Sequence, residues 1–123
     1  MNWKEASILI KNTIQRGDDV NTHKSTFRFV VQVPPFQCKR YNYKNEEGYK
    51  VRIGVRDFLE IPISMLETVF NLALVNNRIY NSKVFATAFP RQLKDHGCHV
   101  HVVGRIFELS RVANKKGGNY EIL

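Results

Sequence analysis

The sequence lacks long apolar runs. Its longest stretches, such as FVVQV and LALV, are far shorter than the roughly 20 residues that cross a membrane. The N-terminal stretch MNWKEASILIKNTI carries charges inside its apolar pattern and has no small-residue cleavage site, so we expect no signal peptide. Cysteine is scarce, with only Cys38 and Cys98. These features indicate reduced thiols in a cytoplasmic protein without membrane contact, with a Cys38–Cys98 disulfide as the alternative.

Patterns typical of catalysis are also missing. There is no glycine-rich phosphate loop and no pair of carboxylates spaced for acid–base chemistry. Asp57 and Glu60 lie beside an expected strand end, where acidic residues usually solvate a turn. Cys98 and His99 are adjacent, but neighbouring side chains on a helix diverge and do not form a nucleophile–base pair. We therefore expect no enzyme activity and no cofactor.

The segment KDHGCHVHVVGRIF, residues 94 to 107, concentrates histidine and cysteine in a way that raises the question of a metal site. A structural zinc site usually needs a second pair of ligands further along the chain. Only Cys38 and His23 remain, and neither has a partner nearby. We expect no metal site, and a metal-dependent enzyme is the third interpretation of the chain. The candidate ligands in the segment are His96, Cys98, His99 and His101.

The sequence is rich in positive charge. Nineteen Lys and Arg against eleven Asp and Glu leave a net charge of +8 on 123 residues, a length typical of one domain. The apolar share of 43% is sufficient for a core without a disulfide or metal. A small basic domain attracts polyanions, of which nucleic acid is the commonest, and the alternative is that the charge serves solubility alone.

The spacing of apolar residues predicts an α+β fold with one domain over 1–123. In the first half, 1–62, residues 3–15 have helical spacing, with Asn2 as N-cap and Gly17 ending the helix. An antiparallel meander of three or four strands follows. We expect its strands at 26–33, stopped by Pro34 and Pro35, at 37–43, and at 49–56 after a turn at 45–48.

The second half, 63–123, returns to helical spacing. Ser64 and Glu67 form a capping box ahead of one helix, which Asn76 and Asn77 close; Asn81 or Ser82 opens another, which Pro90 breaks or bends. Residues 98–113 suit a strand by propensity and a helix by spacing, and we favour a helix beginning near Cys98. A loop at 114–119 and a strand at 120–123 complete the chain.

Two groups of basic residues are candidate contacts to a polyanion. On the strand at 49–56, Lys50, Arg52 and Arg56 lie opposite the apolar residues. Lys39, Arg40, Lys44, Tyr41 and Tyr43 extend this surface, which suits phosphate contacts and base stacking. The alternative is a solvated sheet face. The second group follows the expected C-terminal helix and consists of Lys94, Arg105, Arg111, Lys115 and Lys116.

Residues 64–123 resemble a winged helix in their order of elements: three helices, a basic glycine-containing loop and a strand. The resemblance implies that the third helix enters the major groove of DNA, with His99, His101 and Arg105 near its leading end. Lys115 and Lys116 would then contact the backbone from the wing. One departure is the stretch VHVV, which is unusually β-branched for a recognition helix.

Three segments, IPISMLETVF, RIYNSKVFATAFP and GCHVHVVGRIF, together resemble small uncharacterised bacterial proteins carried on mobile gene cassettes and defence-associated elements. That resemblance implies a bacterial, cytoplasmic protein and no particular activity. From the charges we expect a non-catalytic module that binds DNA or RNA. Phosphate contacts would come from both basic groups and base contacts from His99 and His101. The alternative is a protein-interaction module, with a second copy of the chain as one partner.

Overall fold

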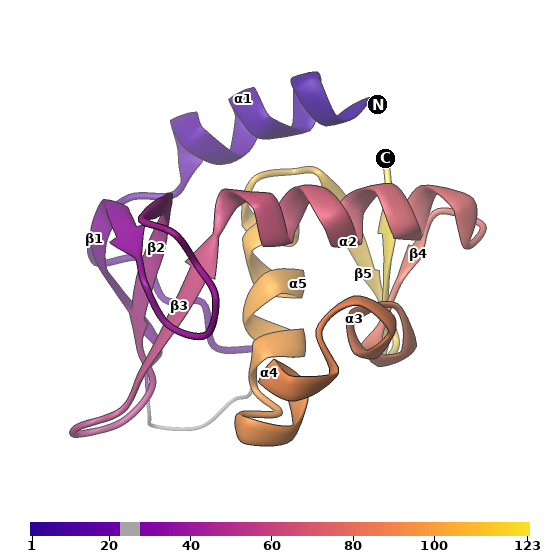
Figure 1. Cartoon of the computed structure of the whole chain (residues 1–123). Coiled ribbons are helices and arrows are strands. Elements are labelled where there is room, and N and C mark those ends of the chain that lie inside the picture. Colours follow the sequence, from indigo (N-terminus) through magenta and orange to yellow (C-terminus); the bar gives the residue numbers. More distant parts are fainter. Residues whose placement is uncertain (23–27) are drawn as a thin grey trace.

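The computed structural model describes residues 1–22 and 28–123 and shows an α+β fold, as expected (Figure 1). The described first half contains α1 (Trp3–Thr13), β1 (Val30–Cys38), β2 (Glu46–Arg52) and β3 (Phe58–Pro62). The second half contains α2 (Ile63–Val75), β4 (Ile79–Tyr80), α3 (Ser82–Ala88), α4 (Pro90–Asp95), α5 (His99–Leu109), β5 (Ala113–Lys116) and β6 (Asn119–Ile122). One continuous cluster of buried apolar side chains draws on both halves.

The N-terminal helix starts as predicted and ends early. The Asn2 side chain accepts a hydrogen bond from the Glu5 amide at 2.9 Å, which satisfies one of the free N–H groups of the first turn. The apolar stripe buries Ala6 and Ile10. The helix stops at Thr13 because Ile14 is already extended, with ψ at 118°. Its expected end at residue 15 is therefore two residues too late.

The first sheet is three-stranded and antiparallel, in the order β1-β2-β3. The expectation that Pro34 and Pro35 stop the first strand is wrong, since β1 continues through them to Cys38. Prolines are tolerated there because β1 is an edge strand, and the pairing with β2 is irregular between Val33 and Phe36. Residues 26 and 27 of the expected strand lie outside the described residues.

The expected strand at 37–43 and the turn at 45–48 are also wrong. The chain instead turns between Cys38, where β1 ends, and Glu46, where β2 begins. Strand β2 ends at Arg52, so Val55 lies in the following turn and its side chain is 77% exposed. The strand β3 was not predicted, because its short sequence FLEIP is buried on both faces and shows no alternation.

The helices of the second half follow the predicted order, with two differences. The capping box at Ser64 is not formed, because the N-cap of α2 is Pro62, two residues earlier, and the helix begins at Ile63. Asn81 caps α3 by accepting a hydrogen bond from the Val84 amide at 3.1 Å. Pro90 breaks the helical run as expected, and it starts the short helix α4 at its first position, where proline is favoured.

Residues 98–113 form the favoured helix, α5, which begins next to Cys98 and ends at Leu109. The expected loop at 114–119 is instead mostly β-hairpin, since β5 runs to Lys116 and turns at Gly117, with φ of +60°, into β6. With β4 these strands form a second antiparallel sheet in the order β4-β6-β5. The second half thus has four helices followed by a hairpin, which agrees only loosely with the winged-helix order of three helices, a loop and a strand.

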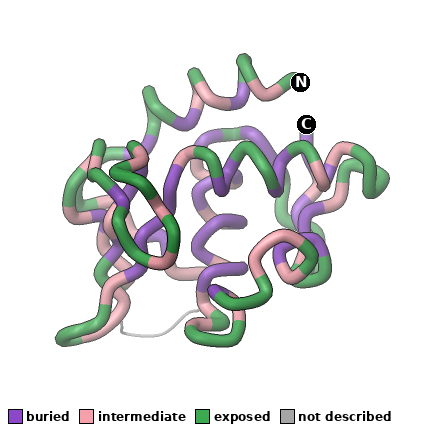
Figure 2. Tube along the Cα trace, viewed as in Figure 1, coloured by how far each residue is buried: buried purple, intermediate pink, exposed green. Residues whose placement is uncertain are grey.

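The helix α5 lies in the middle of the molecule (Figure 1). The first sheet lies on one side of it and the second sheet on the other, while α2 crosses above. Figure 2 shows α5 as buried along most of its length. The helix that the winged-helix resemblance places in a DNA groove is therefore the central helix of the core, and only a few of its side chains reach the surface.

Candidate nucleic-acid interface

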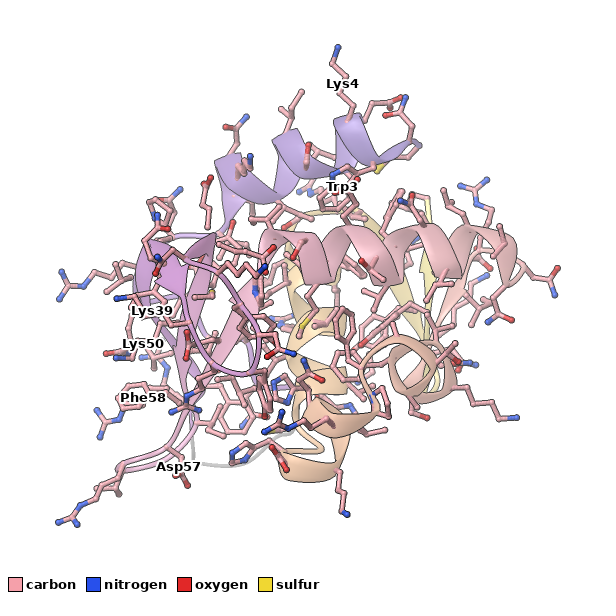
Figure 3. All side chains as sticks on the ribbon, viewed as in Figure 1. Trp3, Lys4, Lys39, Lys50, Asp57 and Phe58 are labelled. Carbon is pink, nitrogen blue, oxygen red and sulfur yellow. The ribbon has the colours of Figure 1, made fainter. Side chains whose placement is uncertain are left out.

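The first sheet presents one face to the core and one face away from the helices. Cross-strand neighbours share a face, and the pairs Lys50–Glu60 and Arg52–Phe58 lie opposite the buried pair Val51–Leu59. Figure 3 shows Lys39, Lys50 and Phe58 on this side of the sheet. We call this surface the outer sheet face; it consists of Val33, Phe36, Lys50, Arg52, Phe58 and Glu60.

Aromatic rings flank a lysine on the outer sheet face. The Nζ atom of Lys50 lies 4.4 Å from the ring centroid of Phe58 and 5.3 Å from that of Phe36. Such a cation–π contact at a partly exposed site contributes about 0.5–1 kcal/mol. All three side chains are half-buried, so part of each ring remains accessible. The contacts hold the ammonium group against two half-buried rings.

The acidic residue of this face, Glu60, is neutralised by its neighbours. Its side chain is only 9% exposed and forms an ion pair with Arg40 at 3.1 Å. One carboxylate oxygen also accepts a hydrogen bond from the Lys39 amide at 2.6 Å. Arg40 in turn donates to the Phe58 carbonyl. Glu60 therefore holds the segment that follows β1 against β3. Because the charge of Glu60 is paired with Arg40, Lys50 and Arg52 are the charged side chains that this face presents outward.

The turn between β2 and β3 extends the positive surface. Arg52 Nε donates to the Gly54 carbonyl at 3.0 Å, which directs its guanidinium along the turn. Arg56 is fully on the surface beside the exposed Val55. The predicted residues Lys50, Arg52 and Arg56 thus lie along one connected part of the chain, from the middle of β2 to the tip of its hairpin.

Tyr41 and Tyr43 do not belong to this face. The Tyr41 hydroxyl donates to Asp95 at 3.0 Å, and the guanidinium of Arg91 lies 5.0 Å from the centre of its ring. Tyr43 accepts a hydrogen bond from Gln92 at 3.0 Å. Both tyrosines therefore attach the loop after β1 to α4. Phe36 and Phe58 were not among the predicted contact residues, and they take the position on the sheet that was expected for the tyrosines.

The two histidines of α5 differ in exposure, and His99 is enclosed in the core. His99 is 1% exposed, its ring stacks on Phe85 with centroids 5.7 Å apart, and its Nδ1 lies 2.8 Å from the His96 carbonyl oxygen. Burial lowers the pKa of His99 below its usual value, because the charged imidazolium would lose its hydration. A side chain in this position reaches no base edge. His101 is partly buried on the same helix.

Arg105 is also held within the fold. Its side chain forms an ion pair with Glu108 at 2.7 Å, while its Nε atom is buried and has no hydrogen-bond partner among the described residues. The wing residues Lys115 and Lys116 are exposed, and Lys116 forms an ion pair with Glu121 at 3.1 Å. In Figure 1 the hairpin of β5 and the first sheet lie on opposite sides of α5. The two predicted basic groups therefore form separate surfaces.

The thiols and the candidate metal ligands show no reactive arrangement in the described chain. Cys38 and Cys98 are both free. Burial, with the negative charges of Glu60 and Glu46, raises the pKa of Cys38 to about 12, and burial also raises the pKa of Cys98. Over residues 1–22 and 28–123, no group of histidine, cysteine and carboxylate side chains is placed to hold a metal ion. His23 lies outside these ranges.

Comparison with known proteins adds no functional assignment. No helix in the described part of the chain is long and apolar enough to cross a membrane. No protein-family model, curated protein or solved structure matches the chain.

Proposed function

We propose that this protein binds single-stranded nucleic acid on the outer sheet face, without catalysis. The observation that carries the proposal is the position of Lys50 between the rings of Phe36 and Phe58. Aromatic rings beside cations are what a single strand requires, because its bases stack on the rings while its phosphates contact the charges. Each stacked base contributes about 1–3 kcal/mol.

The surrounding charges favour the same ligand. Arg52 and Arg56 continue the positive surface along the hairpin, and Lys39 lies at the opposite end of the sheet. Glu60 is already paired with Arg40, so it does not repel a phosphate chain that crosses the face. We expect the strand to run across β1–β3, with bases against the two rings and phosphates near the basic side chains.

Single strands are favoured over duplex DNA by the burial of α5. A duplex-reading helix needs a row of side chains that reach base edges in the major groove. In α5, His99 is buried and Arg105 is paired with Glu108. The first sheet offers no such row, but its half-buried rings, Phe36 and Phe58, are surfaces on which separated bases would stack.

The test is a binding titration with an unstructured labelled oligonucleotide of about 16 nucleotides, compared with a duplex of the same length. Affinity for the single strand should exceed that for the duplex and fall as salt rises from about 50 to about 200 mM. The slope of log K against log salt is negative, and each lost phosphate contact reduces its magnitude by about 0.7 for a single strand. The variant Arg52→Gln/Arg56→Gln should therefore reduce the magnitude of the slope by about 1.4.

The wing supplies a matched control. Lys115→Gln/Lys116→Gln removes the same charge from the separate surface and should leave affinity and slope nearly unchanged. Phe58→Leu keeps an apolar side chain but removes the stacking ring, so it should weaken binding without changing the slope. Absence of binding at the lowest salt contradicts the proposal, and so does an equal loss from the wing variant.

A further inference from the structure

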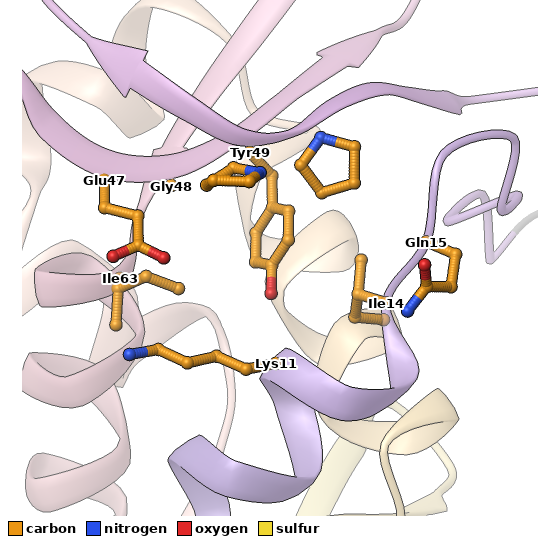
Figure 4. Close-up of a pocket in the computed structure, with 9 residues that line it drawn as sticks. Lys11, Ile14, Gln15, Glu47, Gly48, Tyr49 and Ile63 are labelled. Atoms are coloured by element: carbon orange, nitrogen blue, oxygen red, sulfur yellow. The ribbon is translucent and has the colours of Figure 1, made fainter.

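A second candidate site lies away from the outer sheet face, where α1, the start of α2 and the two strands β1 and β2 meet (Figure 4). It is a pocket of about 140 Å³. This volume is well above the roughly 10–15 Å³ that a single water needs, so the pocket admits a ligand of several heavy atoms. Part of its wall is apolar and is formed by Ile14, Ile63, Pro34 and Pro35.

The hydroxyl of a largely buried tyrosine points into this pocket. Tyr49 is 3% exposed, and Figure 4 shows its hydroxyl directed from the sheet toward α1. Among the described residues no hydrogen-bond partner of this hydroxyl is found, and its oxygen is not one of the buried unpaired side-chain atoms. Solvent therefore reaches the hydroxyl through the pocket. A ligand that carries an acceptor can take the place of this water.

The charges at the pocket have opposite signs and come from different elements. Lys11 extends from the last turn of α1, and Glu47 extends from β2 (Figure 4). They form no ion pair with each other within the described structure. Both are exposed, so each keeps water that a ligand can displace. A ligand that carries both an ammonium and a carboxylate satisfies the two residues together.

We propose that this pocket binds a small zwitterionic ligand, a free α-amino acid with a short apolar side chain. Its carboxylate would contact Lys11 and accept the hydrogen bond of Tyr49, its ammonium would contact Glu47, and its side chain would lie against the prolines. Burial and the charge of Glu47 raise the pKa of Tyr49 to about 12, so the hydroxyl keeps its proton and acts as the donor at neutral pH.

The experiment is an NMR titration of the full chain with L-alanine, followed through the backbone amides of Gly48 and Tyr49. Propionate lacks the ammonium of alanine, and ethylamine lacks its carboxylate. We expect saturable shifts with alanine and at least about tenfold weaker binding of each analogue, the effect of losing one charged hydrogen bond. Equal binding of an analogue, or no saturable shift with alanine, L-valine or L-proline, overturns the proposal.

Variants separate the pocket from a general surface effect. Tyr49→Phe, Lys11→Met and Glu47→Gln should each weaken alanine binding by about tenfold or more. Lys4→Met removes the same charge from an exposed position of α1 outside the pocket, and it should bind alanine like the unchanged chain. Unchanged binding by all three pocket variants also overturns the proposal. The outcome is independent of nucleic-acid binding, because the outer sheet face shares none of these side chains.

Discussion

Replacing Gly104 by alanine tests how tightly the central helix is packed. Helix propensity alone predicts stabilisation, since alanine in a helix interior is favoured over glycine by about 1 kcal/mol. However, a Cβ atom at Gly104 would lie 2.3 Å from Cε2 and 2.5 Å from Cζ of Tyr120. The Tyr120 ring is 2% exposed and packs on Tyr80, whose own hydroxyl donates to the Val100 carbonyl at 2.8 Å. The ring therefore cannot retreat without disturbing a second buried side chain.

Overpacking of this kind typically costs about 1–3 kcal/mol of stability. Because the ring of Tyr120 lies so close to the added Cβ atom, we expect a cost near the upper end of this range. After subtraction of the propensity gain, we expect Gly104→Ala to lower the free energy of unfolding by about 1–2 kcal/mol. For a chain of this length, each kcal/mol corresponds to roughly 4 °C in Tm. The measurement is urea unfolding followed by circular dichroism and by the fluorescence of Trp3, which packs on Phe70.

Two further variants decide whether the ring causes the loss. In a Tyr120→Leu background the ring is gone, so Gly104→Ala should become neutral or stabilising, and the double-mutant cycle should show coupling of about 1 kcal/mol or more. Gly118→Ala is the control outside the helix, because nothing lies within 4 Å of the added Cβ there. Stabilisation by Gly104→Ala in the unchanged background would refute the reasoning.

Three other predictions concern buried polar groups. Because burial lowers the pKa of His99 in the folded state, the unfolded chain takes up its proton first; the free energy of unfolding should decrease as pH falls below the usual value of 6.5. Urea midpoints at a series of pH values should show a smaller decrease in His99→Gln than in His101→Gln, and equal decreases would contradict the assignment. Cys38, with its pKa near 12, should resist iodoacetamide at pH 8 until the chain unfolds, and rapid alkylation of the native protein would disprove its burial. Tyr80→Phe should lower stability by about 1 kcal/mol through the lost hydrogen bond to Val100, and an unchanged urea midpoint would count against that bond.

The sequence predicts the helices better than the strands, for local reasons. Helix starts carry their own signal: the side chains of Asn2 and Asn81 accept hydrogen bonds three residues ahead, and both were recognised. Strand boundaries depend on partners that are distant in the chain. Pro34 and Pro35 stop a central strand but not an edge strand, and only the pairing with β2 shows that β1 is at the edge.

The candidate interface was predictable in its charges but not in its rings. Lys50 and Arg52 follow from alternation within β2, which needs no knowledge of neighbours, whereas Arg56 lies in the turn beyond the end of this strand. Phe58 became part of the same surface only through its pairing with Arg52 across β2 and β3. Because β3 was not recognised, the tyrosines of the preceding loop were expected to supply the aromatic surface, and they pack on α4 instead.

The composition of α5 explains why this helix lies in the core. A helix that is apolar on most sides is stable only when it is buried. In α5, Val100, Val102 and Val103 are all buried, and Gly104 lets the ring of Tyr120 approach the helix backbone closely. The β-branched stretch that seemed out of place in a recognition helix is thus suited to a core helix between two sheets. With α5 enclosed, the nucleic-acid binding that we propose would depend on the sheets at either side of this helix. Within the described part of the chain, only the first sheet places a cation against half-buried aromatic rings.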